Sequence, residues 1–146
     1  MTQMKKEDEI IVVVDRKKLF NNEELIFQGS ISDKKVVKAI ILNMDKYYKS
    51  MRRGGTKEMD VPKANNAELN FDYKQPIPYI VICRGNQYFV TERLQGCGES
   101  RLDGKLSMDI GGHMIPLGYE CNSINKVILE NTMRELNEEI SIIGNE

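Results

Sequence analysis

Short β-branched runs and longer stretches with helical spacing divide the first half of the chain into predicted elements. Residues 9–14, Glu-Ile-Ile-Val-Val-Val, are short and rich in β-branched side chains, which predicts a buried strand. Residues 25–27 suggest a short second strand. Over residues 34–52, apolar side chains recur at steps of three and four, which predicts an amphipathic helix that packs on the core and ends at the glycine pair 54–55.

The second half of the chain contains a hairpin pattern followed by a strand, a glycine pair and a helix. Two apolar runs, residues 79–83 and 87–91, flank Arg-Gly-Asn, where the glycine can adopt the positive φ of a tight turn. Residues 105–110 predict a further strand, which the glycine pair 111–112 breaks. A final helix is expected to begin after Asn122 or Ser123 and to run to about residue 141.

The order of these elements predicts an α+β fold, with a mixed sheet and flanking helices rather than a doubly wound parallel sheet. We expect one domain over residues 1–146. Its N-terminal part, residues 1–76, contains one long helix, and its C-terminal part, residues 77–146, contains the hairpin, the Gly-Gly turn and the last helix. A polar loop at residues 54–77, with a brief strand near residues 69–71, connects the two parts.

The composition narrows the classes of partner. The chain of 146 residues has a net charge of −1, so no general positive field is available to bind a nucleic-acid polymer. No apolar run is long enough to span a membrane. Three cysteines without CxxC spacing indicate reduced thiols rather than a disulfide framework or a zinc site, and we expect a cytoplasmic location.

Three glutamates in the last helix form the candidate chemical centre. Glu135, Glu138 and Glu139 stand at i, i+3 and i+4, so their carboxylates share one face. Like charges at this spacing repel, and at the C-terminal end of a helix they also oppose the helix dipole. Arg134 relieves part of this repulsion, and a divalent cation would relieve more of it.

The other face of the same helix carries apolar residues that could anchor it on a sheet. These residues are Leu129, Met133, Leu136 and Ile140. Taken alone, the glutamates are more typical of a solvated helix surface than of a metal site, because glutamate is a good helix former. The strand and the Gly-Gly turn upstream favour the metal site instead.

Residues 134–140, Arg-Glu-Leu-Asn-Glu-Glu-Ile, resemble the second half of the Nudix box. Its first half begins with a glycine, and the glycine pair 111–112 resembles that start. The stretch 106–113 and the entry to the hairpin at residues 77–79 further resemble a subgroup of predicted Nudix phosphoesterases. The similarity covers about residues 77–142.

The resemblance implies a Nudix helix that holds Mg²⁺ or Mn²⁺. Glu138 and Glu139 would be the main metal ligands, and the carbonyl group of Gly112 a further one. Glu135 would be another ligand or would help to activate water, with Arg134 orienting it. The metal would neutralise a diphosphate and lower the pKa of the attacking water.

The first half of the box departs from the family pattern. Between Gly112 and Arg134 lie 21 residues instead of 13. The box has a glutamate separated from its arginine by seven residues, and Lys126 stands at that position here. Glu120 could serve instead from the enlarged loop or be a surface residue. Ser141 replaces a glycine. These changes place the catalytic efficiency in doubt.

The resemblance also implies that the fold continues beyond this helix, so that the C-terminal part of the fold is expected to be missing from the chain. Few residues follow the helix, whereas a Nudix fold has further strands and a second helix. A truncated chain is the first interpretation. Completion of the sheet by a partner chain, as in a homodimer, is the alternative.

Other residues could bind the phosphates of a substrate. His113, the only histidine, adjoins Gly112 and could contact a phosphate or transfer a proton, although a lone loop histidine is commonly structural. Arg93 follows the hairpin strand and could bind a phosphate or be solvated. For Arg52 and Arg53 we favour solvated cations.

Three functions are therefore open. The leading hypothesis is a Mg²⁺-dependent hydrolase of a small phosphorylated substrate, a nucleoside diphosphate-linked or related phosphoanhydride. The second is a catalytically impaired Nudix-like module that binds a ligand or regulates. The third is an unrelated α/β protein with an acidic helix, which would be favoured if the helix did not pack beside the Gly-Gly turn.

Overall fold

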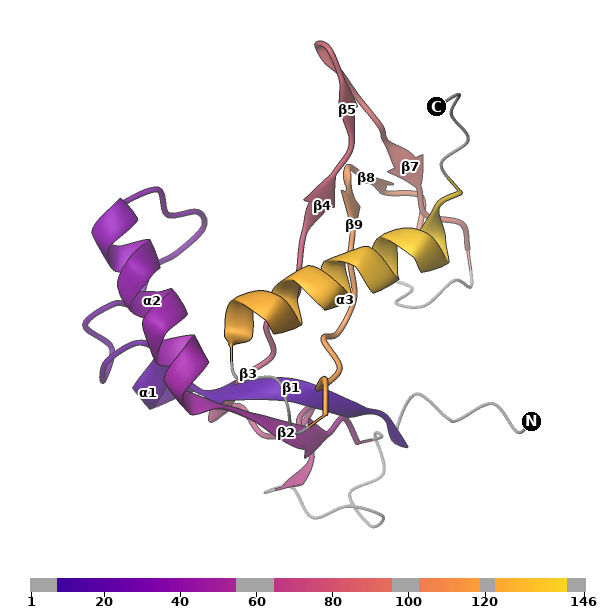
Figure 1. The fold of residues 1–146 in the computed structure, drawn as a ribbon. Helices are drawn as coiled ribbons and strands as arrows, with labels where there is room; N and C mark the ends of the chain where they lie inside the picture. The colour runs from indigo at the N-terminus through magenta and orange to yellow at the C-terminus, as the bar shows by residue number, and fades with distance from the viewer. Residues whose placement is uncertain (1–7, 55–64, 96–102, 119–122, 142–146) are drawn as a thin grey trace.

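A computed structural model describes residues 8–54, 65–95, 103–118 and 123–141, and its helices and strands confirm the predicted α+β class (Figure 1). In chain order the elements are β1 (Ile10–Asp15), α1 (Arg16–Leu19), α2 (Lys34–Tyr47), β2 (Tyr48–Arg52), β3 (Tyr73–Lys74), β4 (Ile80–Val81), β5 (Cys83–Arg84), β6 (Gln87–Tyr88), β7 (Thr91–Glu92), β8 (Leu106–Ser107), β9 (Asp109–Ile110) and α3 (Ile124–Glu139).

Strand β1 is the centre of a three-stranded antiparallel sheet with the order β2-β1-β3. Its side chains alternate between two faces, and both faces are covered, which explains why the strand is continuously apolar. On one face Ile11 and Val13 pack with Met51 and Ala67, and Tyr73 of β3 borders this cluster. The core of the N-terminal half is thus built around β1.

The opposite face of β1 connects the N-terminal sheet to helix α3. Val12 packs against Met114, Ile124 and Val127, all of them at most 1% exposed. The backbone N–H of Val12 also donates to the carbonyl oxygen of Met114 at 2.7 Å. The segment after the Gly-Gly turn is therefore fixed along β1, with α3 packed over it.

The described strands of the second half pair antiparallel in two-stranded sheets, β4 with β9, β5 with β6, and β7 with β8. The predicted hairpin is confirmed: Arg84 pairs with Gln87, and Gly85 between them has a φ of 60°. The predicted strand at residues 105–110 is present as β8 and β9, and β9 ends at Ile110, just before Gly111. Figure 1 shows these strands beyond α3, on the side away from β1 and β2.

The predicted helix over residues 34–52 is too long, because α2 ends at Tyr47 and Tyr48–Arg52 form strand β2. Met51 lies opposite Ile11 in the antiparallel ladder and is 7% exposed. Tyr48 and Met51 fit both a helical and an extended pattern, and the antiparallel pairing with β1 stabilises the extended conformation. The glycine pair at 54–55 therefore does not end the helix.

The short strand expected at residues 25–27 is absent, and the chain turns there instead. Asn21, Asn22 and Glu23 all have positive φ, and Ile26 and Phe27 are 50% and 40% exposed. The brief strand expected near residues 69–71 lies slightly later, at β3, since Leu69 and Asn70 donate their N–H groups to the carbonyl oxygen of Asn66 in a turn.

Helix α2 packs less deeply than its pattern suggests, since none of its residues is buried. Ile41 and Met44 are partly buried against the Val12 cluster, whereas Leu42 is 59% exposed. The helix has a second role, because the carboxylate of Asp45 accepts the N–H of Ile124 at 2.5 Å and caps the start of α3. No helix in the described part of the chain is long and apolar enough to cross a membrane.

Candidate functional site

Helix α3 is rotated relative to the sequence-based prediction. Its buried residues are Ile124, Val127, Asn131 and Glu135, so the stripe that faces the sheet ends in a carboxylate. Leu129 and Met133, expected to anchor the helix, are 59% and 47% exposed, and that part of the prediction is wrong. Leu136 and Ile140 are half-buried. The rotation brings Glu135 against the Gly-Gly turn.

Glycine at position 112 makes this close approach feasible. A β-carbon on Gly112 would lie 2.4 Å from Oε1 and 2.6 Å from Oε2 of Glu135. Glu135 is 7% exposed and is ion-paired with Arg134, so its carboxylate can turn away from position 112 only by giving up that pair. Because α3 packs beside the Gly-Gly turn, the feature that would favour an unrelated protein with an acidic helix is not found.

Arg134 links the acidic helix to the loop behind the Gly-Gly turn. Its Nη2 donates to Oε1 of Glu135 at 2.5 Å and to the carbonyl oxygen of His113 at 2.9 Å, and its Nη1 donates to both carboxylate oxygens of Glu138 at 3.1 Å. Burial disfavours the charged guanidinium, but the hydrogen bonds and charges of Glu138 and Glu135 outweigh it and raise the pKa of Arg134. The orienting role predicted for Arg134 is compatible with this geometry.

Asn131 is a structural residue of the site that the sequence pattern did not reveal. It is 1% exposed, and its side chain exchanges two hydrogen bonds with the backbone of Ile115: Nδ2 donates to the carbonyl oxygen at 3.0 Å and Oδ1 accepts the N–H at 2.8 Å. Nδ2 also donates to the carbonyl oxygen of Val127 at 2.8 Å. An asparagine at the i+7 position of the buried stripe from Ile124 was the available signal.

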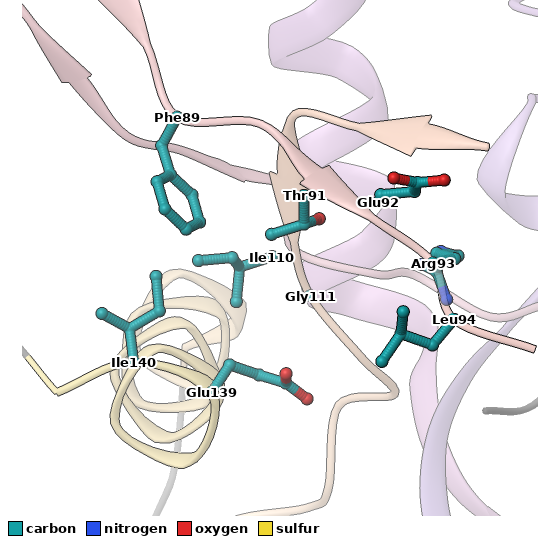
Figure 2. A pocket seen from close by; sticks show the side chains of 9 residues that line it. All are labelled: Phe89, Thr91, Glu92, Arg93, Leu94, Ile110, Gly111, Glu139 and Ile140. Atoms are coloured by element: carbon teal, nitrogen blue, oxygen red, sulfur yellow. The ribbon is translucent and has the colours of Figure 1, made fainter. Parts of the chain in front are cut away.

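A cavity of about 440 Å³ lies beside the C-terminal end of α3. It is lined by residues of β7, β9 and α3 and of the segments next to them, namely Phe89, Thr91, Glu92, Arg93, Leu94, Ile110, Gly111, Glu139 and Ile140 (Figure 2). Two predicted site residues, Arg93 and Glu139, therefore face one space, although they lie 46 positions apart in the sequence. The cavity is of the size that holds a small-molecule ligand.

The three glutamates do not form one cluster. Glu135 is buried at Gly112, Glu138 is exposed and paired with Arg134, and Glu139 lines the cavity. Within the described residues, no group of three or more His, Cys, Asp or Glu side chains is positioned to hold a metal ion. Glu120, the suggested substitute for the first box glutamate, lies outside the described residues. The metal-ligand set of Glu135, Glu138, Glu139 and Gly112 stays a prediction.

The ring of His113 is directed toward the N-terminal sheet. Its Nε2 lies 2.7 Å from Oε1 of Gln75. Burial, and then the charge of Arg53, lower the pKa of His113, while Glu68 and Glu9 oppose this shift. Its role in binding substrate stays a prediction. Arg53 is ion-paired with Glu9 and Glu68 at 3.0 and 2.7 Å.

The free energy of unfolding is expected to decrease as the pH is lowered below 6.5, in part because of His113. Burial lowers the pKa of His113 from 6.5, and the charge of Arg53 lowers it further. The unfolded chain therefore binds a proton at a higher pH than the folded chain, so protonation favours unfolding. The stabilisation is complete above 6.5 and is lost as the pH falls through the lowered pKa.

Urea unfolding at several pH values tests this expectation. One group changes stability by at most about 1.4 kcal/mol per pH unit, and solvent screening at this half-buried site reduces that. His113→Gln keeps a polar partner for Gln75 and should have a shallower slope than the wild-type chain. Equal slopes in the two proteins would contradict the assignment.

Comparison with known proteins supports the fold. No protein-family model matches the chain. The chain is 42% identical over 139 residues to Protein YmaB of Bacillus subtilis (strain 168). The aligned region covers 95% of this chain and 62% of that protein. A solved structure, "Crystal structure of Tm1382, a putative Nudix hydrolase", matches with a TM-score of 0.58 at 22% identity, over 94% of this chain and 61% of that one.

The chain thus spans less than two thirds of the length of both proteins. Its resemblance to the phosphoesterase subgroup and the expected truncation stay predictions. The match in structure, together with the helices and small antiparallel sheets described above, shows that this chain has a Nudix-like α+β fold.

Proposed function

We propose that this chain is a Mg²⁺-dependent hydrolase of a phosphoanhydride in a small phosphorylated substrate. The observation that supports the proposal best is the cavity, where Glu139 from α3 and Arg93, which directly follows β7, line the same space beside Gly111. An acidic and a basic side chain converging on one cavity suit a metal-bound anion, because the carboxylate binds the cation and the guanidinium binds phosphate oxygens.

The chemistry of the side chains fits magnesium, although the described residues alone do not complete a site. Mg²⁺ prefers oxygen ligands and is commonly held by one or two carboxylates together with substrate phosphates and water. Glu139 and the exposed carboxylate of Glu138 would supply the protein ligands. When bound, the metal would neutralise phosphate charge and lower the pKa of the attacking water.

The other residues would position the substrate and the attacking water. Arg93 would hold a phosphate oxygen. Glu135 would accept the proton of the water, and Arg134, which bonds Glu135 and Glu138 together, would fix both carboxylates in place. Gly112 leaves the space that Glu135 occupies.

A catalytically impaired binding or regulatory module is the second candidate, and the position of Arg134 favours it. This one guanidinium contacts both oxygens of Glu138 and one oxygen of Glu135. Metal binding would have to compete with these ion pairs. If the competition fails, the cavity would bind a phosphorylated ligand through Arg93 without hydrolysing it.

Release of nucleoside monophosphate or phosphate from a panel of nucleoside diphosphate derivatives distinguishes the two candidates. The assay is run with Mg²⁺, with Mn²⁺ and with a chelator, and Mn²⁺ binding is measured separately. We expect turnover that requires the metal. Ligand binding without turnover would favour the binding module, and absence of both turnover and Mn²⁺ binding would remove the metal-site assignment.

A further inference from the structure

The cavity beside α3 has two ends of different chemistry. Figure 2 shows Phe89, Ile110 and Ile140 gathered toward one end, while Glu92 and Arg93 lie toward the other, where Leu94 is the one apolar side chain beside them. Ile110 is 7% exposed and forms part of the floor, and Phe89 is 48% exposed, so its ring is available to a ligand. A ligand that fills both ends needs an apolar part and an anionic part.

The apolar end offers few polar partners. Its three side chains have no hydrogen-bonding atoms. The N–H of Phe89 already donates to the carbonyl oxygen of Ile82 at 2.9 Å, and the N–H of Ile140 donates to that of Leu136 at 3.0 Å. Thr91, the one hydroxyl among the described residues of the lining, donates to the carbonyl oxygen of Ser107 at 3.3 Å.

A nucleobase would find few hydrogen-bond partners at the apolar end of the cavity. Its ring nitrogens and exocyclic groups need hydrogen-bond partners once they leave water, and an unpaired polar group opposes binding. A hydrocarbon group has no such requirement and gains from contact with Phe89, Ile110 and Ile140.

We propose that the cavity selects a diphosphate that carries an apolar hydrocarbon substituent rather than a hydrogen-bonded nucleobase. This inference rests on the proposed function, since it places the diphosphate at Arg93 and Glu139. The hydrocarbon lies against Phe89, Ile110 and Ile140. Glu92 also lines the charged end, so the anion is held by Arg93 and the divalent cation against an acidic neighbour.

Binding of three probes that all contain a diphosphate unit tests the selection. Octyl diphosphate, adenosine diphosphate and inorganic pyrophosphate are titrated calorimetrically with Mg²⁺, and phosphate release is followed in parallel. We expect octyl diphosphate to bind about 10-fold tighter than either other probe. Phe89→Ala should remove most of that advantage and leave pyrophosphate binding unchanged, whereas Phe89→Leu should keep most of it. Circular dichroism verifies that both variants are folded.

The outcomes separate this inference from the proposed hydrolysis. Phe89-dependent binding of octyl diphosphate without turnover would support the selection and overturn the hydrolase. Metal-dependent turnover with equal or tighter binding of adenosine diphosphate, or an equal effect of Phe89→Ala on all three probes, would overturn the selection alone. No binding of any probe would overturn both.

Discussion

Substituting Glu139 by glutamine is expected to lower the metal-dependent turnover of a diphosphate substrate roughly 100-fold or more. Glutamine keeps the size of the side chain and one carbonyl oxygen, but it removes the negative charge that a divalent cation requires. Glu139 lines the cavity together with Arg93, and no ion pair holds it within the described residues. Its loss should therefore leave the free energy of unfolding almost unchanged.

Glu130 provides a matched control on the same helix. It is exposed and does not line the cavity, so Glu130→Gln changes the net charge by the same amount without changing the site. We expect wild-type turnover and Mn²⁺ affinity from Glu130→Gln and reduced values of both from Glu139→Gln. Equal activity in the two variants would show that Glu139 does not bind the metal.

The parts of the site that local sequence predicts well are those set by backbone geometry. The strand before Gly111, the turn at Gly85 and the last helix were all predicted, because glycine positions and apolar spacing constrain the backbone directly. The convergence of Arg93 and Glu139 on one cavity could be suggested only by the resemblance, since it depends on how β7 and α3 pack.

The orientation of α3 was predicted wrongly because two polar residues lie on its buried face. Burying Asn131 or Glu135 would be unfavourable if the side chain had no hydrogen-bond partner. In the folded chain the partners are the backbone of Ile115 and the guanidinium of Arg134. Apolar spacing therefore favoured the face with Leu129 and Met133. Hydrogen bonding between distant segments decided the orientation of the helix, and apolar spacing alone does not report it.

The end of α2 shows the same limit in the sheet. Residues 48–52 continue a helical pattern, yet they form β2, because the backbone N–H and C=O groups along that side of β1 need hydrogen-bond partners. Strand pairing of this kind joins segments more than thirty positions apart, as Ile11 and Met51 illustrate. The local conformational preference of these residues is weak compared with the stabilisation from a complete antiparallel ladder.

Alanine at position 111 is expected to destabilise the chain more than alanine at position 112, although the two glycines are neighbours. A β-carbon on Gly111 would lie 2.1 Å from the carbonyl oxygen of Pro78, a backbone atom just before β4. The pairing of Ile80 with Ile110 fixes both backbones, so neither can move away without breaking the ladder. We expect Gly111→Ala to cost about 3 kcal/mol in the free energy of unfolding.

For Gly112→Ala, the atoms nearest to the added β-carbon belong to the carboxylate of Glu135, the far end of a side chain with rotatable bonds. This carboxylate can shift at the expense of its ion pair with Arg134, so we expect a loss of about 1 kcal/mol. The double variant Gly112→Ala/Glu135→Ala should lose less stability than the two single changes added together, because it removes the clash. Urea unfolding is measured for the wild-type chain, the three single variants Gly111→Ala, Gly112→Ala and Glu135→Ala, and the double variant. If Gly111→Ala is as stable as Gly112→Ala, the junction between β4 and β9 is not the rigid support that positions Gly112 under Glu135.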